Sequence, residues 1–152
     1  MASMGVWRKF AVVLLVLVAV SSGCITGSGA GSDVIDAVTP DPHQTLGCYD
    51  EGIDGAPGRN CSMFVGGTQA EVVAKLANAL TTEGFAVGCS SSTSDASAVT
   101  VSGARPDLRV TATVASTGSV ADKPIPFGWV GVDIDASEYK NSVPSESGPC
   151  SV

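Results

Sequence analysis

The chain has few of the residues on which catalytic and nucleic-acid-binding sites depend. It contains one histidine, 8 lysines and arginines against 15 aspartates and glutamates, and 5% aromatic residues. A single histidine restricts a serine triad to one possible base, and scarce basic residues argue against nucleic acid or anionic lipid as a charge-driven partner. The motifs Cys-x-x-Cys and Gly-x-Ser-x-Gly do not occur. The sequence therefore predicts no cofactor and no nucleic-acid partner.

A hydrophobic run long enough to span a membrane is also missing. Apolar residues make up 44% of the chain, but 16 of them lie in residues 1–23. The longest run, Phe10–Val20, has eleven residues, whereas a spanning helix needs about 20. Residues 24–152 hold 15 acidic and 6 basic side chains, a net charge of −9. They are expected to form one acidic domain, because the length allows no more than one.

The first 24 residues have the layout of an export signal. The basic pair Arg8-Lys9 precedes the apolar run, and the small residues Ser-Ser-Gly then lead directly to Cys24. A basic start, a short apolar centre and small residues at the end are typical of a secretory signal. Small residues before a cysteine at this place resemble the lipobox of bacterial lipoproteins. Ser21 stands where that family usually has leucine or another aliphatic residue.

The resemblance to bacterial lipoproteins implies a position in the cell. In that family the signal peptidase cuts before the cysteine, whose sulfur carries a diacylglycerol. Residues 1–23 would then be the signal peptide, and Cys24 would be the lipid attachment site. The expected location is the outer face of the cell membrane. The expected partners are the membrane, which is contacted through the lipid, and an unknown protein or cell-wall partner. The remaining chain is similar to small actinobacterial lipoproteins of unknown function.

The number of cysteines agrees with a lipidated Cys24. The chain has five cysteines, and an odd one in an exported protein needs an explanation. With Cys24 lipidated, four cysteines remain and can form two disulfides. Four cysteines allow three pairings. The favoured pairs are Cys48–Cys61 and Cys89–Cys150, and Cys61–Cys89 is kept as the alternative.

The domain organisation follows from composition and periodicity. Residues 24–45 are rich in Gly, Ser, Asp and Pro without apolar periodicity, which predicts a flexible tether that contains the lone His43. Residues 46–152 are predicted to form a single domain. Its helix is expected at about 68–83, because Thr68 and Glu71 are spaced as a capping box and Gly84 follows an apolar stripe.

Four short runs after the helix alternate between apolar and polar residues, as strands with one wet face do. They lie at residues 85–89, 99–101, 108–114 and 130–134. The predicted fold is α+β: one amphipathic helix packed on a small, mainly antiparallel four-stranded sheet, with two disulfides. The disulfides are expected to support a thin hydrophobic core.

Candidate chemical sites are weak. Asp50 and Asp54 are spaced like the first ligands of a calcium loop, but Cys61 stands where such loops have a bidentate glutamate. No metal is therefore expected. Asp133 and Asp135 lie on one face of the last predicted strand, and paired carboxylates can hydrolyse glycosides. A cell-envelope hydrolase that uses these two carboxylates is the alternative function.

Aromatic residues around the last strand give the preferred hypothesis. Phe127, Trp129 and Tyr139 flank this strand and are candidates for a shallow surface that binds a peptide or a sugar. The favoured alternative for Trp129 is a structural one, in which it caps the thin core. The sequence therefore favours a lipid-anchored, extracytoplasmic binding or interaction module without catalytic activity. A purely structural spacer is a third hypothesis, which the well-formed helix and strands make less attractive.

Overall fold

The computed structural model describes residues 29–51, 56–91, 96–138 and 149–150. The predicted signal peptide and Cys24 lie outside the described residues, and so do Asp54 and Tyr139. Among the residues that are described, no helix is both long and apolar enough to cross a membrane.

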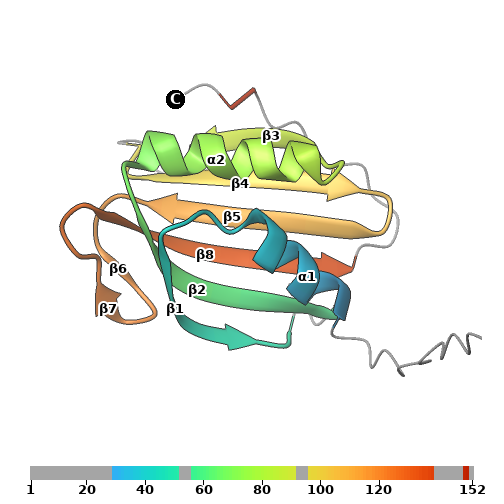
Figure 1. Cartoon of the computed structure of the whole chain (residues 1–152), viewed down its shortest axis with the longest axis horizontal. Helices are drawn as coiled ribbons and strands as arrows, with labels where there is room; N and C mark the ends of the chain where they lie inside the picture. Colours follow the sequence, from blue (N-terminus) through green and yellow to red (C-terminus); the bar gives the residue numbers. More distant parts are fainter. Residues whose placement is uncertain (1–28, 52–55, 92–95, 139–148, 151–152) are drawn as a thin grey trace, which may run out of the picture.

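A six-stranded antiparallel sheet forms the centre of the molecule, and two helices cover one of its faces (Figure 1). The strand order is β1-β2-β8-β5-β4-β3. The strands are β1 His43–Tyr49, β2 Gly58–Gly66, β3 Ala86–Ser91, β4 Ala98–Arg105, β5 Leu108–Ala115 and β8 Trp129–Glu138. Helix α1, Gly29–Val38, lies on β2 and β8, whereas helix α2, Gln69–Thr82, lies on β3, β4 and β5. A separate hairpin pairs β6, Ser119–Val120, with β7, Lys123–Pro124.

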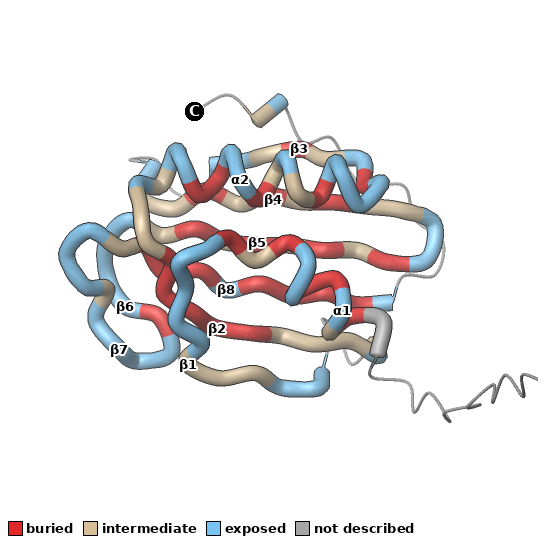
Figure 2. Tube along the Cα trace, viewed as in Figure 1, coloured by how far each residue is buried: buried red, intermediate tan, exposed pale blue. Residues whose placement is uncertain are grey.

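The core lies between the helices and the sheet (Figure 2). Side chains alternate between the two faces of a strand, so one residue in two along β5 and β8 points at the helices. These positions are apolar and buried: Leu108, Val110, Ala112 and Val114 on β5, and Val130, Val132, Ile134 and Ala136 on β8. We call the opposite sheet face the outer face, and in the central strands it carries mostly small polar residues.

The predicted helix is confirmed as α2. Thr68 Oγ1 accepts a hydrogen bond from the Glu71 backbone N–H, while the Glu71 carboxylate accepts one from the Thr68 N–H at 2.9 Å. At the other end Gly84 has a φ of 81° and the Phe85 N–H bonds to the Leu80 carbonyl at 3.0 Å. This is a Schellman ending, in which glycine takes a left-handed conformation that other residues avoid. Both ends of the helix are therefore fixed by local sequence.

The cap of α2 predicts a pH dependence of stability. The backbone and side-chain hydrogen bonds from Thr68 lower the pKa of Glu71 below its ordinary value of 4.5. The hydrogen bonds to the ionised Glu71 carboxylate therefore stabilise the fold fully at pH values above 4.5, and this stabilisation is lost as the pH falls through the lowered pKa of Glu71. Glu71→Gln keeps an acceptor but does not titrate. Urea unfolding at about pH 6 and about pH 3 should show wild type losing more stability than this variant; equal losses would contradict the expectation.

The prediction of a four-stranded sheet is wrong. All four predicted strands occur, as β3, β4, β5 and β8, and they are neighbours in the sheet. Strand β2 extends this sheet beyond β8, and β1 pairs with β2. Strand β2 was missed because Cys61–Val65 is buried on both faces, so hydrophobicity does not alternate there. Strand β1 is an edge strand whose first three residues are exposed and polar, which gives no apolar signal.

The structure also differs from the predicted flexible tether at residues 24–45, of which it describes residues 29–45. Residues 29–38 form α1, and Val34, Ile35 and Val38 are buried in the core. These three apolar residues lie within little more than one helical turn, too few to give a visible period in a segment of Gly, Ser and Asp. His43 begins β1, where its Nδ1 lies 2.9 Å from the Asp41 carboxylate. The folded domain thus begins by residue 29.

The prediction of two disulfides is confirmed. They join Cys48 to Cys61 and Cys89 to Cys150, the pairs favoured from the sequence. Cys48 and Cys61 are directly opposite each other on β1 and β2, so the first bond fastens the edge strand. Cys89 lies on β3 at the other edge, and the second bond holds residue 150 against the core. Each edge of the sheet therefore carries one covalent link.

Candidate functional site

The carboxylates of β8 lie on the outer face, among small polar side chains. Asp133 is exposed and accepts a hydrogen bond from the Ser62 hydroxyl on β2. Asp135 is 6% exposed, and its carboxylate accepts a hydrogen bond from Ser137 at 3.0 Å. The prediction that the two aspartates share a face is consistent with their positions two residues apart in β8. Their hydrogen bonds are those expected for the polar side of a sheet.

The β6–β7 hairpin packs on one end of the outer face. Val120 is buried although it lies outside the main core, and so is Phe64 of β2, which is directly opposite Gly131. A Cβ atom added at Gly131 would collide with the Val120 side chain and would lie 3.0 Å from Ile125 Cδ1. The absence of a side chain at Gly131 is therefore what lets the hairpin approach the sheet.

Gly131→Ala tests this packing. The added methyl group has to displace Val120 or Ile125, so we expect a loss of stability of about 1–3 kcal/mol. Gly47→Ala is the matched control, because its new Cβ would meet only the Tyr49 hydroxyl, at 4.0 Å. Urea unfolding of both variants compares the two sites. A loss at Gly131 no larger than that at Gly47 would show that the hairpin does not depend on this contact.

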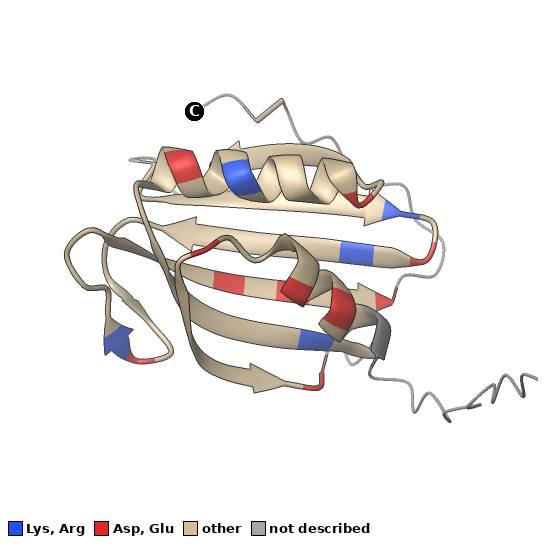
Figure 3. Ribbon diagram, viewed as in Figure 1, with Lys and Arg blue, Asp and Glu red and all other residues tan. Residues whose placement is uncertain are grey.

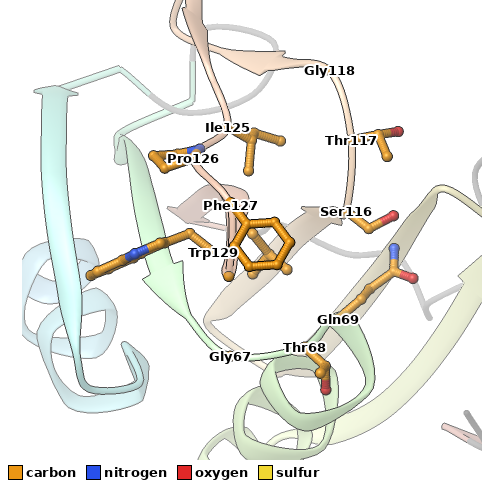
Figure 4. Close-up of a pocket in the computed structure, with 12 residues that line it drawn as sticks. Gly67, Thr68, Gln69, Ser116, Thr117, Gly118, Ile125, Pro126, Phe127 and Trp129 are labelled. Atoms are coloured by element: carbon orange, nitrogen blue, oxygen red, sulfur yellow. The ribbon is translucent and has the colours of Figure 1, made fainter.

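The hairpin and the start of α2 form the walls of a groove at this end of the sheet (Figure 4). The groove has a volume of about 640 Å³, within the range of small-molecule sites. Its lining comes from the segment before and at the start of α2, from the end of β5 and from the segment that leads into β8. The lining residues are Gly67, Thr68, Gln69, Ser116, Thr117, Gly118, Ile125, Pro126, Phe127, Gly128, Trp129 and Val130.

Phe127 is the most prominent side chain of the groove. It is fully exposed, at 105% of its reference area, and Tyr49 is the other large hydrophobic residue exposed in the described chain. In Figure 4 Ser116, Thr117 and Gln69 lie on one side of Phe127 and the Trp129 indole lies on the other. Trp129 is half-buried. The residues that the structure describes leave this ring uncovered at the mouth of the groove, where it is a candidate contact surface.

Backbone and side-chain hydrogen bonds hold the walls in place. The Ile125 N–H bonds to the Gly118 carbonyl and the Trp129 N–H to the Pro126 carbonyl, both at 3.1 Å. These bonds close the loop that carries Phe127. The Gln69 amide nitrogen donates to the carbonyls of Ser97, at 3.0 Å, and Val114, at 2.9 Å. The Gln69 carbonyl oxygen is then left to accept a hydrogen bond from a ligand. The groove is largely preformed.

The structure brings two of the three predicted aromatic residues together. Phe127 and Trp129 line the same groove, while Tyr139 lies outside the described residues. The opposite wall, formed by Thr68, Gln69 and the residues after β5, was not predicted. Its residues are ordinary polar ones whose only shared feature is their place in the fold, so no sequence signal marks them.

The weak cation site has no support in the described residues. Asp50 forms an ion pair with Arg59 at 2.9 Å, and Asp54 is not described. Across the ranges that the structure describes, no cluster of three or more metal-ligating side chains is found. Asp50 therefore acts as the partner of Arg59.

Comparisons with protein-family models, curated proteins and solved structures find no match to this chain.

Proposed function

We propose that the chain is a lipid-anchored protein of the outer face of the cell membrane, and that it binds a partner in the Phe127 groove without catalysing a reaction. The observation that carries the proposal concerns the cysteines. Four of the five are paired in two disulfides, which leaves Cys24, the residue that follows the lipobox-like segment. Neither disulfide needs Cys24, so its sulfur is the one that the proposal assigns to the lipid.

The disulfides also support export. Disulfides persist in oxidising compartments and are rare in the reducing cytosol. Here they fasten both edges of the sheet, so the fold makes structural use of an oxidising environment. Export is what the basic, apolar and small segments of residues 1–24 are predicted to direct.

The anchor and the groove would lie at opposite ends of the domain. Four residues separate Cys24 from α1, so the chain between them reaches about 18 Å at most. Helix α1 begins over the far end of β8, where a Cβ at Gly31 would lie 2.9 Å from the Ala136 carbonyl oxygen. Trp129 is seven residues away along β8, about 23 Å at the usual rise (Figure 1). A lipid on Cys24 would thus present the groove away from the membrane.

The lining of the groove supports binding rather than acid–base chemistry. None of its twelve residues has a side chain that titrates near neutral pH. General acid–base catalysis needs such a side chain within hydrogen-bond reach of the substrate. The groove offers instead an exposed aromatic ring, hydroxyl groups and one amide, which are groups that bind.

Photo-cross-linking on intact cells tests the proposed surface. A benzophenone amino acid is placed at position 127 and, as a matched control, at position 49, the other exposed aromatic site. We expect an adduct from position 127 and none from position 49, because only the first lies in the groove. Equal yields from the two positions would contradict the groove as the binding surface.

A further inference from the structure

The groove is uncharged although the protein is strongly acidic. The whole chain has a net charge of −7, yet none of the residues that line the groove is Asp, Glu, Lys or Arg. The charged tip of the β6–β7 hairpin lies beyond the groove lining (Figure 3), whereas the Glu71 carboxylate borders the groove, where Thr68 donates hydrogen bonds to it. An anionic ligand would lose hydration here without gaining a cationic partner from the lining. The lining therefore disfavours an anionic ligand.

The groups of the groove also match a ligand that is apolar on one side and rich in hydroxyls at its rim. Phe127, Ile125 and Pro126 provide an apolar surface. The Thr117 hydroxyl can donate and accept, and the Gln69 carbonyl oxygen can accept. The Thr68 and Ser116 hydroxyls already donate to the Glu71 carboxylate and the Ser97 carbonyl, so they offer a ligand only their oxygens as acceptors. A pyranose ring has this division, because its C–H groups form flat apolar patches while its hydroxyls point outward from the ring edge.

We propose that the groove binds an uncharged polysaccharide chain, which deepens the proposed function by naming the class of partner and rests on it. The aromatic ring of Phe127 would stack on a sugar face, and the polar wall would hydrogen-bond the sugar hydroxyls. The position of the groove away from the anchor suits a polymer outside the membrane better than a lipid of the bilayer.

Tryptophan fluorescence gives a direct readout at the groove. The chain has two tryptophans, and Trp7 lies in the predicted signal peptide, so Trp129 is the sole tryptophan of the predicted mature protein and can be excited selectively at the red edge of the absorption band. The mature lipoprotein, in nanodiscs of phosphatidylcholine, is titrated with maltohexaose, cellohexaose and chitohexaose. Hexagalacturonate is the charged probe, a decaproline peptide is the peptide probe, and brominated lipid in the nanodisc reports contact of Trp129 with the membrane.

At least one neutral hexasaccharide is expected to change the Trp129 emission. Phe127→Ala should weaken this binding about tenfold, the loss of one aromatic contact of about 1.4 kcal/mol, whereas Tyr49→Ala should leave it unchanged. Hexagalacturonate should bind more weakly than the neutral sugars, and brominated lipid should not quench Trp129. Thermal unfolding of both variants shows whether they are folded.

Three results would overturn the proposal, and they separate it from the proposed function. Binding of decaproline alone, lost in Phe127→Ala, would leave the groove as a binding site for a peptide. Quenching by brominated lipid would make it a membrane contact. No response to any neutral hexasaccharide would remove the polysaccharide as the ligand. Equal cross-linking from positions 127 and 49 in addition would also remove the groove as the binding surface.

Discussion

Replacing Cys24 with serine, behind a secretory signal whose cleavage needs no cysteine, is expected to move the protein from the membrane fraction to the soluble fraction. Two acyl chains bind a bilayer stably, with about 0.8 kcal/mol contributed by each buried CH₂ group, and a hydroxyl at position 24 removes the attachment point. Residues 24–152 carry a net charge of −9, so electrostatic attraction to an anionic bilayer does not replace the lipid. Fractionation of cells followed by detection of the protein measures the change.

Ser21→Leu is the matched control for this experiment. It places the aliphatic residue that lipoprotein signals usually have at this position and leaves Cys24 intact, so the protein should stay in the membrane fraction. A Cys24→Ser variant that stays there after the exchanged signal has been cleaved would contradict lipid anchoring, since neither a lipid nor the apolar run Phe10–Val20 would then hold the chain.

The second large effect is expected at α1. Ile35 is 2% exposed and packs in the core with Val34 and Val38. Ile35→Ala should lower the free energy of unfolding by about 2–5 kcal/mol, because it removes buried methyl groups and leaves a cavity. That is a large share of the roughly 5–15 kcal/mol of a typical domain. Urea unfolding of the soluble Cys24→Ser form measures the loss.

Asp36→Ala is the control within the same helix. Asp36 is exposed, so its removal should change the stability by no more than about 0.5 kcal/mol. A similarly small change for Ile35→Ala would mean that α1 is not docked on the sheet. The segment would then be the flexible tether that its composition predicts, and the groove would no longer have a fixed direction relative to the membrane.

Local patterns allowed part of the fold to be predicted. The capping box at Thr68 and the glycine at position 84 specify the ends of α2 through contacts within a few residues. Alternating residues on β5 likewise show one buried and one half-buried face. Where a strand is covered on both sides this signal disappears, as in β2, whose Phe64 is buried on the outer face near the β6–β7 hairpin.

Helix α1 could not be predicted and the groove could be predicted only in part, because both depend on the assembled fold. Three apolar side chains in α1 become core residues only because β2 and β8 lie beneath them. Phe127 and Trp129 could be singled out because aromatic residues are scarce in this chain and these two lie beside a predicted strand. Thr68 and Ser116 are 48 positions apart, and only the sheet brings them to the same groove.

The intact mass of the protein extracted from membranes tests the central claim most directly. Lipid anchoring predicts a chain that begins at Cys24, carries the mass of a diacylglycerol with or without one further acyl group, and is four hydrogens lighter than the reduced form because of the two disulfides. A chain that retains Met1, or one that begins at Cys24 without added acyl mass, would contradict the account.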